Sequence, residues 1–189
     1  MLFRSGAVVR GVVAHGDSVV VVGCGPVGLM AVICAANVAG RLIGVDGVLA
    51  RRELAERLGA EAVPPEQAAD FVAEATDGLG ADVVIEAAGS PAGLDAALRL
   101  ARGCGTVSVV GAHFEPDFPL DNGLMFEREL TLRFSIGDPT QHGGLLLDRL
   151  ATGRLDPTPV VTHRLPLADA GEAYRLFDTR EATKVVLTP

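Results

Sequence analysis

The sequence has no tryptophan, a single tyrosine and only 4 % aromatic residues. Its core must therefore be built from aliphatic side chains, which the 49 % of hydrophobic residues can supply. Short Val-rich runs of the kind found in this chain are typical of strands that are buried on both faces, as in a parallel sheet covered by helices. With 189 residues, the chain is long enough for one large domain with an appendage.

Basic residues are scarce: 16 Lys and Arg stand against 24 Asp and Glu, which gives a net charge of −8. This balance argues against nucleic acid or an anionic membrane as a partner, because binding to phosphate groups needs a positively charged surface. Long apolar runs are also missing. Residues 18–36 come nearest to the roughly 18 residues of a membrane span, but Gly23, Gly25, Pro26 and Gly28 interrupt them. We recognise no signal peptide and expect a cytoplasmic protein.

Cysteine and histidine are too few and too scattered to indicate a metal site. The three cysteines, Cys24, Cys34 and Cys104, include no pair with the spacing of a zinc ribbon. We expect buried or half-buried thiols and no disulfide framework. The four histidines have no partner at helical spacing and no nearby cysteine, so we expect surface or capping residues. They are His15, His113, His142 and His163.

Short Val/Ile runs alternate with helical stretches along most of the chain. Strands are predicted at residues 18–23, 41–46, 62–63, 82–87, 106–111 and 130–136, and helices at 26–39, 49–58, 66–75, 94–101 and 143–151. Such alternation predicts βαβ units with right-handed crossovers, and hence a parallel sheet. Six strands in two halves of three predict a doubly wound α/β fold of the Rossmann type, with strand order 3-2-1-4-5-6.

The alternation ends near Gly153, where a Pro-containing linker begins. Beyond it a strand, a helix and a strand are predicted at 160–165, 168–177 and 184–187. We therefore expect a domain built on the sheet (6–152) and a C-terminal segment (153–189) that has to pack on something else. Residues 1–5 have no structural logic before the first Val-rich run, and we interpret them as a non-native leader.

A glycine-rich motif follows the first predicted strand. Residues 23–28, Gly-Cys-Gly-Pro-Val-Gly, satisfy the pattern G-x-G-x-x-G and lead directly into an apolar helix. In this setting Gly23 permits a tight turn, Gly25 lets the backbone approach a pyrophosphate, and Gly28 lets the helix pack closely on the strand. The N-terminus of the helix, which Pro26 opens, offers N–H groups and a positive dipole end to the anion.

Three charged residues stand at or just beyond the carboxyl ends of predicted strands. Asp46 can bind the hydroxyls of an adenine ribose and repel a 2′-phosphate, which favours NAD over NADP; its alternative role is a turn or helix cap. Arg51 can reach the same ribose or remain a solvated helix residue. Glu86 can line the cofactor crevice together with Ala87 and Ala88, or it can orient that loop through hydrogen bonds without touching NAD.

Several runs resemble one known family. Four runs resemble, in this order, the cofactor domain of zinc-dependent medium-chain alcohol dehydrogenases: GDSVVVVGCGPVGLMAV, IGVDGVLARRELAERLGAEAV, GADVVIEAAGSPAGLDAAL and GTVSVVG. The C-terminal end of that family is resembled by the run THRLPLADAGEAYRLFDTREATKVVL. The resemblance implies an oxidoreductase that transfers hydride between an alcohol and NAD. It implies cofactor contacts at Gly23, Gly25, Pro26, Val27, Gly28, Asp46, Arg51, Ala87, Ala88, Val110, Gly111, Ser135 and Gly137.

The same resemblance implies that the zinc ligands and the alcohol site belong to an N-terminal domain that this chain lacks. No catalytic residue or metal ligand is therefore assigned here, and we expect the chain to be inactive alone. The family commonly forms homodimers or homotetramers through the edge of the sixth strand, here residues 130–136. Since the tail would pack on the missing domain, we expect Val160, Val161, Leu165 and Val185 to be partly exposed.

Two other functions remain open. A non-catalytic module would bind NAD without turnover. A methyltransferase domain, which binds S-adenosylmethionine, also joins a glycine-rich turn to an acidic residue after its second strand. The long aliphatic helix after Pro26 and the expected parallel sixth strand argue against the methyltransferase. A short-chain dehydrogenase is not indicated, because Tyr174 is followed four residues later by Asp178 and not by lysine.

Overall fold

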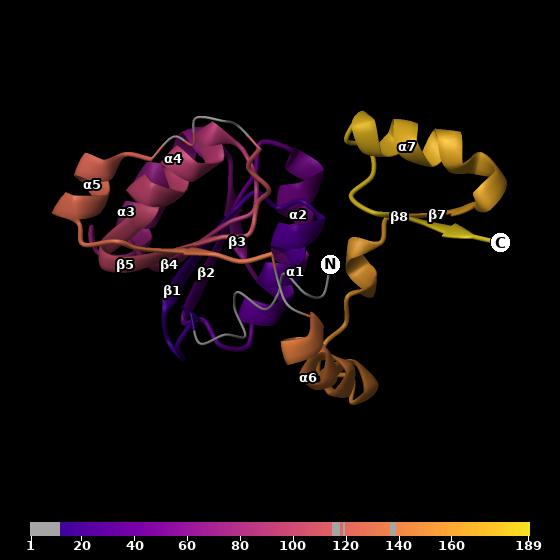
Figure 1. The fold of residues 1–189 in the computed structure, drawn as a ribbon, viewed down its shortest axis with the longest axis horizontal. Coiled ribbons are helices and arrows are strands. Elements are labelled where there is room, and N and C mark those ends of the chain that lie inside the picture. The colour runs from indigo at the N-terminus through magenta and orange to yellow at the C-terminus, as the bar shows by residue number, and fades with distance from the viewer. Residues whose placement is uncertain (1–11, 115–117, 119, 137–138) are drawn as a thin grey trace.

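A six-stranded parallel sheet forms the centre of the structure (Figure 1). The computed structural model describes residues 12–114, 118, 120–136 and 139–189. The strands run in the order β3-β2-β1-β4-β5-β6, and every neighbouring pair is parallel, which confirms the predicted Rossmann fold. Their bounds are β1 Ser18–Val22, β2 Arg41–Val45, β3 Glu61–Val63, β4 Ala81–Glu86, β5 Ala101–Val109 and β6 Thr131–Phe134.

Helices connect successive strands, as the crossovers of a parallel sheet require. They are α1 Pro26–Ala35, α2 Leu49–Arg57, α3 Ala68–Ala75 after the short 3₁₀ helix η3 Pro65–Gln67, α4 Pro91–Leu100, α5 Asn122–Glu127 and α6 Pro139–Ala151. Across the described parts of the chain, we find no helix with the length and apolar character needed to cross a membrane.

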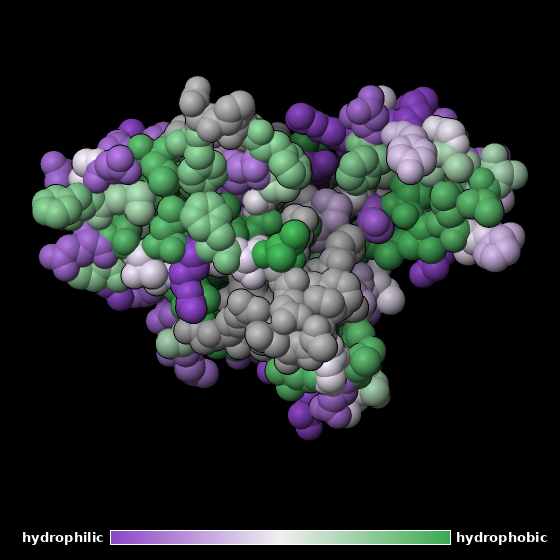
Figure 2. All heavy atoms as spheres, viewed as in Figure 1, coloured by the Kyte–Doolittle hydropathy of each residue, from purple (hydrophilic) through white to green (hydrophobic). Residues whose placement is uncertain are grey.

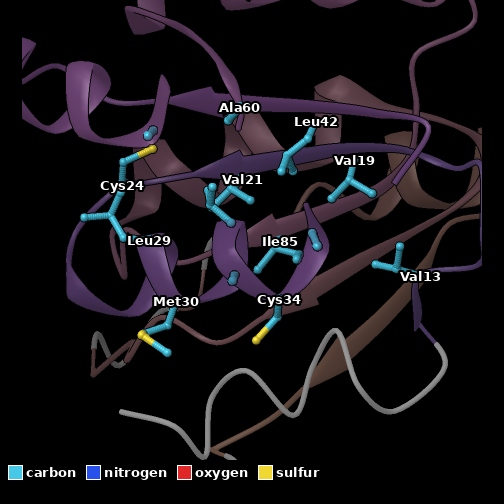
Figure 3. Close-up of a cluster of buried hydrophobic side chains, with 14 of the residues drawn as sticks. Val13, Val19, Val21, Cys24, Leu29, Met30, Cys34, Leu42, Ala60 and Ile85 are labelled. Carbon is cyan, nitrogen blue, oxygen red and sulfur yellow. The ribbon is translucent and has the colours of Figure 1, made fainter. Parts of the chain in front are cut away.

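The core divides into two clusters because successive side chains of a strand point to opposite faces of the sheet. In β1, Val19 and Val21 belong to the cluster under α1, whereas Val20 and Val22 belong to the cluster under α3 and α4. Figure 3 shows side chains of β1, β2, β4 and α1 in the first of these clusters, which also contains side chains from α2 and α6. The central strands are therefore buried on both sides, as their unbroken Val/Ile runs predict.

The fifth strand differs from its prediction. It begins at Ala101, and its pairing with β4 jumps from Ala81↔Ala101 to Val83↔Thr106. This jump in register marks a bulge in β5 between Ala101 and Thr106. Within the bulge, Cys104 adopts φ 57° and its side chain is exposed. The expectation of three buried or half-buried thiols is therefore wrong for Cys104, although Cys24 and Cys34 are buried.

The stretch between β5 and β6 contains a helix that the sequence analysis missed. This helix, α5, is only six residues long, which is too short to show a hydrophobic period. Its one sequence signal is Asp121, whose carboxylate accepts a hydrogen bond from the backbone N–H of Leu124 at 2.9 Å.

The C-terminal segment forms a small structure of its own. β7 (His163–Pro166) and β8 (Val185–Thr188) pair in parallel and are connected by η5 (Leu167–Asp169) and α7 (Ala170–Asp178). Its strand was predicted to begin at Val160. The chain instead forms the 3₁₀ helix η4 (Thr158–Val160) there, because Pro159 has no N–H to give to a strand ladder.

The prediction of a partly exposed tail is confirmed for three of its four residues and is wrong for Val160. Val161, Leu165 and Val185 are only partly buried, and Figure 2 shows hydrophobic side chains gathered on this segment. Val160, in contrast, is fully buried, because it packs with Leu155 into the cluster under α1. The beginning of the segment is thus anchored on the large sheet, and the incomplete burial is confined to the part beyond it.

At the amino ends of β1 and β4, one carboxylate joins three groups. The Asp82 carboxylate accepts hydrogen bonds from the backbone N–H of Ser18 (2.8 Å), from the Ser18 hydroxyl (2.6 Å) and from the guanidinium of Arg102 (2.6 Å). Burial alone would raise the pKa of Asp82, but these donors outweigh it and hold the pKa below the ordinary value of 3.8.

We expect Asp82→Asn to lower the free energy of unfolding by roughly 1 kcal/mol at pH 7. A carboxylate with a lowered pKa stabilises the fold fully above its unfolded pKa, and this contribution is lost as the pH falls through the folded pKa. Urea titrations between pH 7 and pH 2.5 should therefore show the free energies of unfolding of the wild type and of Asp82→Asn converging below pH 3.8. Asp178→Asn, at the exposed end of α7, is the control. A difference in free energy of unfolding between wild type and Asp82→Asn that stays constant down to pH 2.5 would contradict this account.

Candidate functional site

The turn after β1 has little room for side chains. Gly23 adopts φ 90°, a conformation that favours glycine, and a Cβ placed on it would lie 2.6 Å from the backbone N of Ala88. A Cβ on Gly28 would collide with the carbonyl oxygen of Gly23. Both glycines are therefore required for the close packing of β1, α1 and the loop after β4, as predicted from the motif.

Gly25 differs from these two glycines, because a Cβ placed on it would meet nothing within 4 Å. It occupies the N-cap position of α1, where no side chain accepts from the free N–H groups and no acidic residue stands in the first turn. An uncapped helix N-terminus that faces open space is suited to an anion. Pro26 begins the helix beside this space, and Val27 packs against the core cluster.

Asp46 lies directly after β2 and is tied to the glycine turn. Its Oδ2 accepts a hydrogen bond from the N–H of Cys24 at 2.8 Å, and its Oδ1 accepts from the N–H of Val48 at 2.8 Å. Only 8 % of the residue is exposed. The carboxylate thus closes a turn before α2, which is one of the roles considered from the sequence, and it also lines the space in front of Gly25.

Two arginines of α2 surround this carboxylate. The Nη1 of Arg51 lies 3.8 Å from Asp46 Oδ2, and the Nη1 of Arg52 donates to the carbonyl oxygen of Asp46 at 2.8 Å. Arg51 is mostly buried, so it is not the solvated helix residue considered as its alternative. Its Nε is buried without a hydrogen-bond partner among the described residues. A buried donor of this kind is suited to an incoming polar ligand.

Gly25, Asp46 and Arg51 line one cavity of about 540 Å³ at the carboxyl ends of the central strands. Ala87 and Ala88 line it, as predicted, and so do Ser90 and Gly93 near the start of α4. Phe177 and Arg180 also line the cavity, from the end of α7 and just beyond it, and neither was predicted as a site residue. Arg180 adopts φ 62°. No sequence signal places the end of that helix beside the glycine turn, because the contact depends on tertiary packing.

A second cavity of about 370 Å³ lies beyond β5 and β6. The predicted residues Val110, Gly111 and Ser135 line it, and the N–H of Ser135 donates to the carbonyl oxygen of Val109 at 3.0 Å. Gly137, also predicted, falls outside the described residues. The remaining lining is mostly aromatic or aliphatic and includes Ala112, His113, Phe114, Phe118, Phe134 and Ile136.

Glu86 is the last residue of β4, and 0 % of its surface is exposed. Its Oε1 accepts from the N–H of Gly89 at 2.8 Å, and its Oε2 lies 3.0 Å from the Nε2 of His113. The carboxylate lines neither cavity, which favours the loop-orienting alternative. The expectation that His113 is a surface or capping residue is wrong: its side chain is 4 % exposed because it reaches inward to Glu86.

Cys24 lies between the two outer glycines of the turn but points into the core. Burial, followed by the nearby Asp46 carboxylate, raises the pKa of its thiol to about 12. The residue therefore remains a protonated thiol near neutral pH and fills space against Gly44 in β2.

Metal ligation was considered for the same regions. Across residues 12–114, 118, 120–136 and 139–189, no three side chains of His, Cys, Asp or Glu come together in a way that could hold a metal ion. The residues that the structure describes therefore do not fit zinc. The open space at Gly25, the Asp46 carboxylate and the Arg51 Nε, which has no partner among those residues, fit a dinucleotide.

Comparison with known proteins gives one consistent family. Residues 26–148 match the family described as zinc-binding dehydrogenase. The chain is 37 % identical over 177 residues to the protein named "Probable zinc-binding alcohol dehydrogenase" of Mycobacterium tuberculosis, covering 93 % of this chain and 46 % of that protein. It is 34 % identical over 186 residues to L-threonine 3-dehydrogenase of Bacillus licheniformis, covering 92 % and 52 %.

Solved structures agree with these relatives. The alcohol dehydrogenase TADH from Thermus sp. ATN1 superposes with a TM-score of 0.94 at 38 % identity, and the match covers 99 % of this chain and 56 % of that one. Zinc-dependent alcohol dehydrogenase 2 of Streptococcus pneumonia gives a TM-score of 0.89 at 32 % identity. The chain spans about half the length of the curated relatives it matches.

The glycines of the turn provide a matched pair of variants. We expect Gly25→Ala to unfold at the wild-type temperature, because its methyl group meets nothing, yet to lose dinucleotide binding at least tenfold because the methyl group occupies the space in front of α1. Gly28→Ala should instead lower the melting temperature, because its methyl group meets the Gly23 carbonyl. Gly171→Ala in α7 is the control. Thermal melts and NADH titrations measure both effects, and equal NADH affinity in wild type and Gly25→Ala would contradict the assignment.

The three thiols should react very differently. At pH 8 in native buffer, an excess of iodoacetamide should modify Cys104 within minutes, whereas Cys24 and Cys34 should react only after unfolding, because the thiolate is the reactive form and burial suppresses it. Mass spectrometry of tryptic peptides gives the order of labelling. Rapid modification of Cys24 in the folded protein would show that the glycine turn opens in solution.

Proposed function

Because the chain belongs to the zinc-binding dehydrogenase family, we propose that it forms the NAD-binding part of an alcohol dehydrogenase. The observation that carries this proposal is the uncapped N-terminus of α1, which faces open space at Gly25 inside a cavity shared with Asp46. Phosphate binds to the N–H groups of such a helix, and a carboxylate at the end of the second strand binds the hydroxyls of the adenine ribose.

The proposed cofactor follows the carboxyl edge of the sheet. Its pyrophosphate lies at Gly25 and Pro26, with Gly23, Val27 and Gly28 shaping the turn. Its adenosine half lies beside Asp46 and Arg51, between the loop of Ala87 and Ala88 and the end of α7. Its nicotinamide half lies in the cavity lined by Val110, Gly111 and Ser135, and Gly137 follows Ser135 by two positions in the sequence.

When bound, NAD supplies the hydride acceptor for oxidation of an alcohol carbon. The residues of this chain bind and orient it, and they exclude water from the face of the nicotinamide that rests on the apolar cavity of about 370 Å³. Zinc and the alcohol are proposed to bind a part of the parent enzyme that corresponds to the unmatched half of the relatives. For this polypeptide alone, we propose cofactor binding without turnover.

The edge of the sheet is proposed as the site of self-association. Among the described strands, β6 pairs on one side only, with β5. Two large side chains near its end, Phe134 and Ile136, are 61 % and 83 % exposed. An unpaired strand edge beside exposed hydrophobic side chains favours pairing with another chain. A homodimer, or a tetramer made of such dimers, would cover this edge.

We propose that the chain divides between residues 152 and 153 into a domain built on the large sheet and a C-terminal segment. The C-terminal segment presents an apolar hollow of about 270 Å³, lined by Tyr174, Phe177, Val185 and neighbouring residues. We propose that this surface packs on the remaining part of the parent enzyme. The alternative of a methyltransferase domain is not favoured, because β6 runs parallel to β5 and the family match is to dehydrogenases.

Calorimetric titration of the chain with NADH and NADPH tests the cofactor. We expect NADH to bind at least tenfold more tightly than NADPH, because Asp46 repels a 2′-phosphate. Asp46→Ala should lose both binding and thermal stability, since the carboxylate also holds the N–H groups of Cys24 and Val48. Asp46→Asn keeps one acceptor oxygen and removes the charge, so it should reduce the preference for NADH with a smaller loss of melting temperature.

Glu53→Gln, an exposed residue of α2, provides the matched control for removal of a nearby acidic charge. It should bind both cofactors as the wild type does. A wild-type chain that binds neither cofactor, or binds both equally, would contradict the proposal.

A further inference from the structure

Glu86 and His113 form a polar pair within an otherwise apolar part of the sheet. The Glu86 carboxylate is completely buried, and the imidazole of His113 is nearly so. A carboxylate can only accept hydrogen bonds, so the imidazole donates from Nε2 to Oε2 across 3.0 Å. The second oxygen accepts from the N–H of Gly89. Each oxygen thus has a donor from a different loop.

The surrounding backbone leaves room for this carboxylate. A Cβ on Gly111 would lie 2.5 Å from Glu86 Oε2, and a Cβ on Gly93 would lie 3.0 Å from Oε1. The N–H groups of Val110 and Gly111 both donate to the Glu86 carbonyl, at 2.8 and 2.9 Å. Side chain and backbone of one residue therefore hold the loop after β5.

The same pair connects two loops that line different cavities. Residues 87–89 follow β4, and Ala87 and Ala88 among them line the cavity of about 540 Å³. Residues 110–113 follow β5 and line the cavity of about 370 Å³. The loops already touch, since a Cβ on Gly89 would lie 2.9 Å from the Ala112 carbonyl oxygen. On its outer side the His113 ring packs edge-on against Phe118, with ring centroids 5.0 Å apart.

Stability does not account for such a pair. A buried ion or ion pair loses hydration that its mutual attraction seldom exceeds, and apolar residues of similar volume often stabilise a core as well. The other neighbours of Glu86 in β4, Val84 and Ile85, follow that apolar pattern. The position of the pair at the carboxyl end of the sheet, where ligands of doubly wound folds bind, indicates a role in the site instead.

We infer that His113 is a positioning residue for the nicotinamide half of the bound dinucleotide, and that Glu86 holds it in place. The pair sets the loop of residues 110–113 against the loop of residues 87–89, and so fixes the floor of the nicotinamide cavity relative to the adenosine cavity. This inference rests on the proposed function. The pair lines up the two halves of the cofactor without touching the pyrophosphate.

Two ligands separate the halves of the cofactor. NADH occupies both cavities, whereas ADP-ribose carries no nicotinamide and reports the adenosine half alone. We expect His113→Leu to weaken NADH binding about tenfold, or roughly 1.4 kcal/mol, because the loop of residues 110–113 is no longer held against the loop of residues 87–89. The dissociation constant of ADP-ribose should stay within about twofold of the wild type. The blue shift of bound NADH fluorescence should also decrease, because the nicotinamide becomes more accessible to water.

Conservative variants keep the test valid if the leucine variant does not fold. His113→Gln can still donate from its amide nitrogen to Glu86, so it should retain a ratio of NADH to ADP-ribose affinity within threefold of the wild type. His113→Asn is of the same polarity but too short to reach the carboxylate, so it should behave like His113→Leu. His15→Leu, at an exposed histidine, is the control and should change neither ligand.

The outcomes distinguish this inference from the proposed function. A wild-type chain that binds neither ligand would contradict the proposed function itself. If the wild type binds both but with equal affinity, the loop holds no nicotinamide and the inference fails. It fails also if His113→Asn and His113→Gln weaken both ligands equally, since that result indicates a general structural role.

Discussion

The passage of the β1–α1 turn beneath the loop after β4 is the constraint on which the rest of the site depends. Gly23 approaches the backbone of Ala88 so closely that no side chain fits, and Gly28 lets α1 lie directly on the turn. The helix therefore begins at the carboxyl edge of the sheet with its N–H groups facing outward at Gly25. Aliphatic packing under α1, with Leu29 and Met30 fully buried, holds the helix in that place.

Two buried carboxylates extend this constraint to the neighbouring strands. Asp46, after β2, holds the N–H of Cys24 in the glycine turn, and Glu86, at the end of β4, holds the N–H of Gly89. In each case a charge that would be unfavourable in the core is balanced by donors from a loop. The edge of the sheet is thus shaped by side chain–backbone bonds as well as by packing.

The periodic part of the fold could be predicted from the sequence, because strands buried on both faces give unbroken Val/Ile runs such as 19–22. The glycine turn could also be predicted, since its residues are adjacent in sequence and each has one steric reason. The remaining features depend on contacts between distant residues. His113 meets Glu86 across 27 positions, Val160 packs under α1, and Phe177 reaches the cavity from α7. No local sequence pattern predicts these tertiary contacts.

The double attachment of Asp46 has a consequence for how such a domain can change over generations. In the proposed function, acceptance of a phosphorylated ribose requires removal of the negative charge at Asp46, yet the same carboxylate accepts hydrogen bonds from the N–H groups of Cys24 in the glycine turn and of Val48 before α2. A single replacement therefore alters cofactor choice and local folding together. An evolutionary route to another cofactor has to acquire a compensating acceptor for the Cys24 N–H first, so the order in which substitutions can accumulate is restricted.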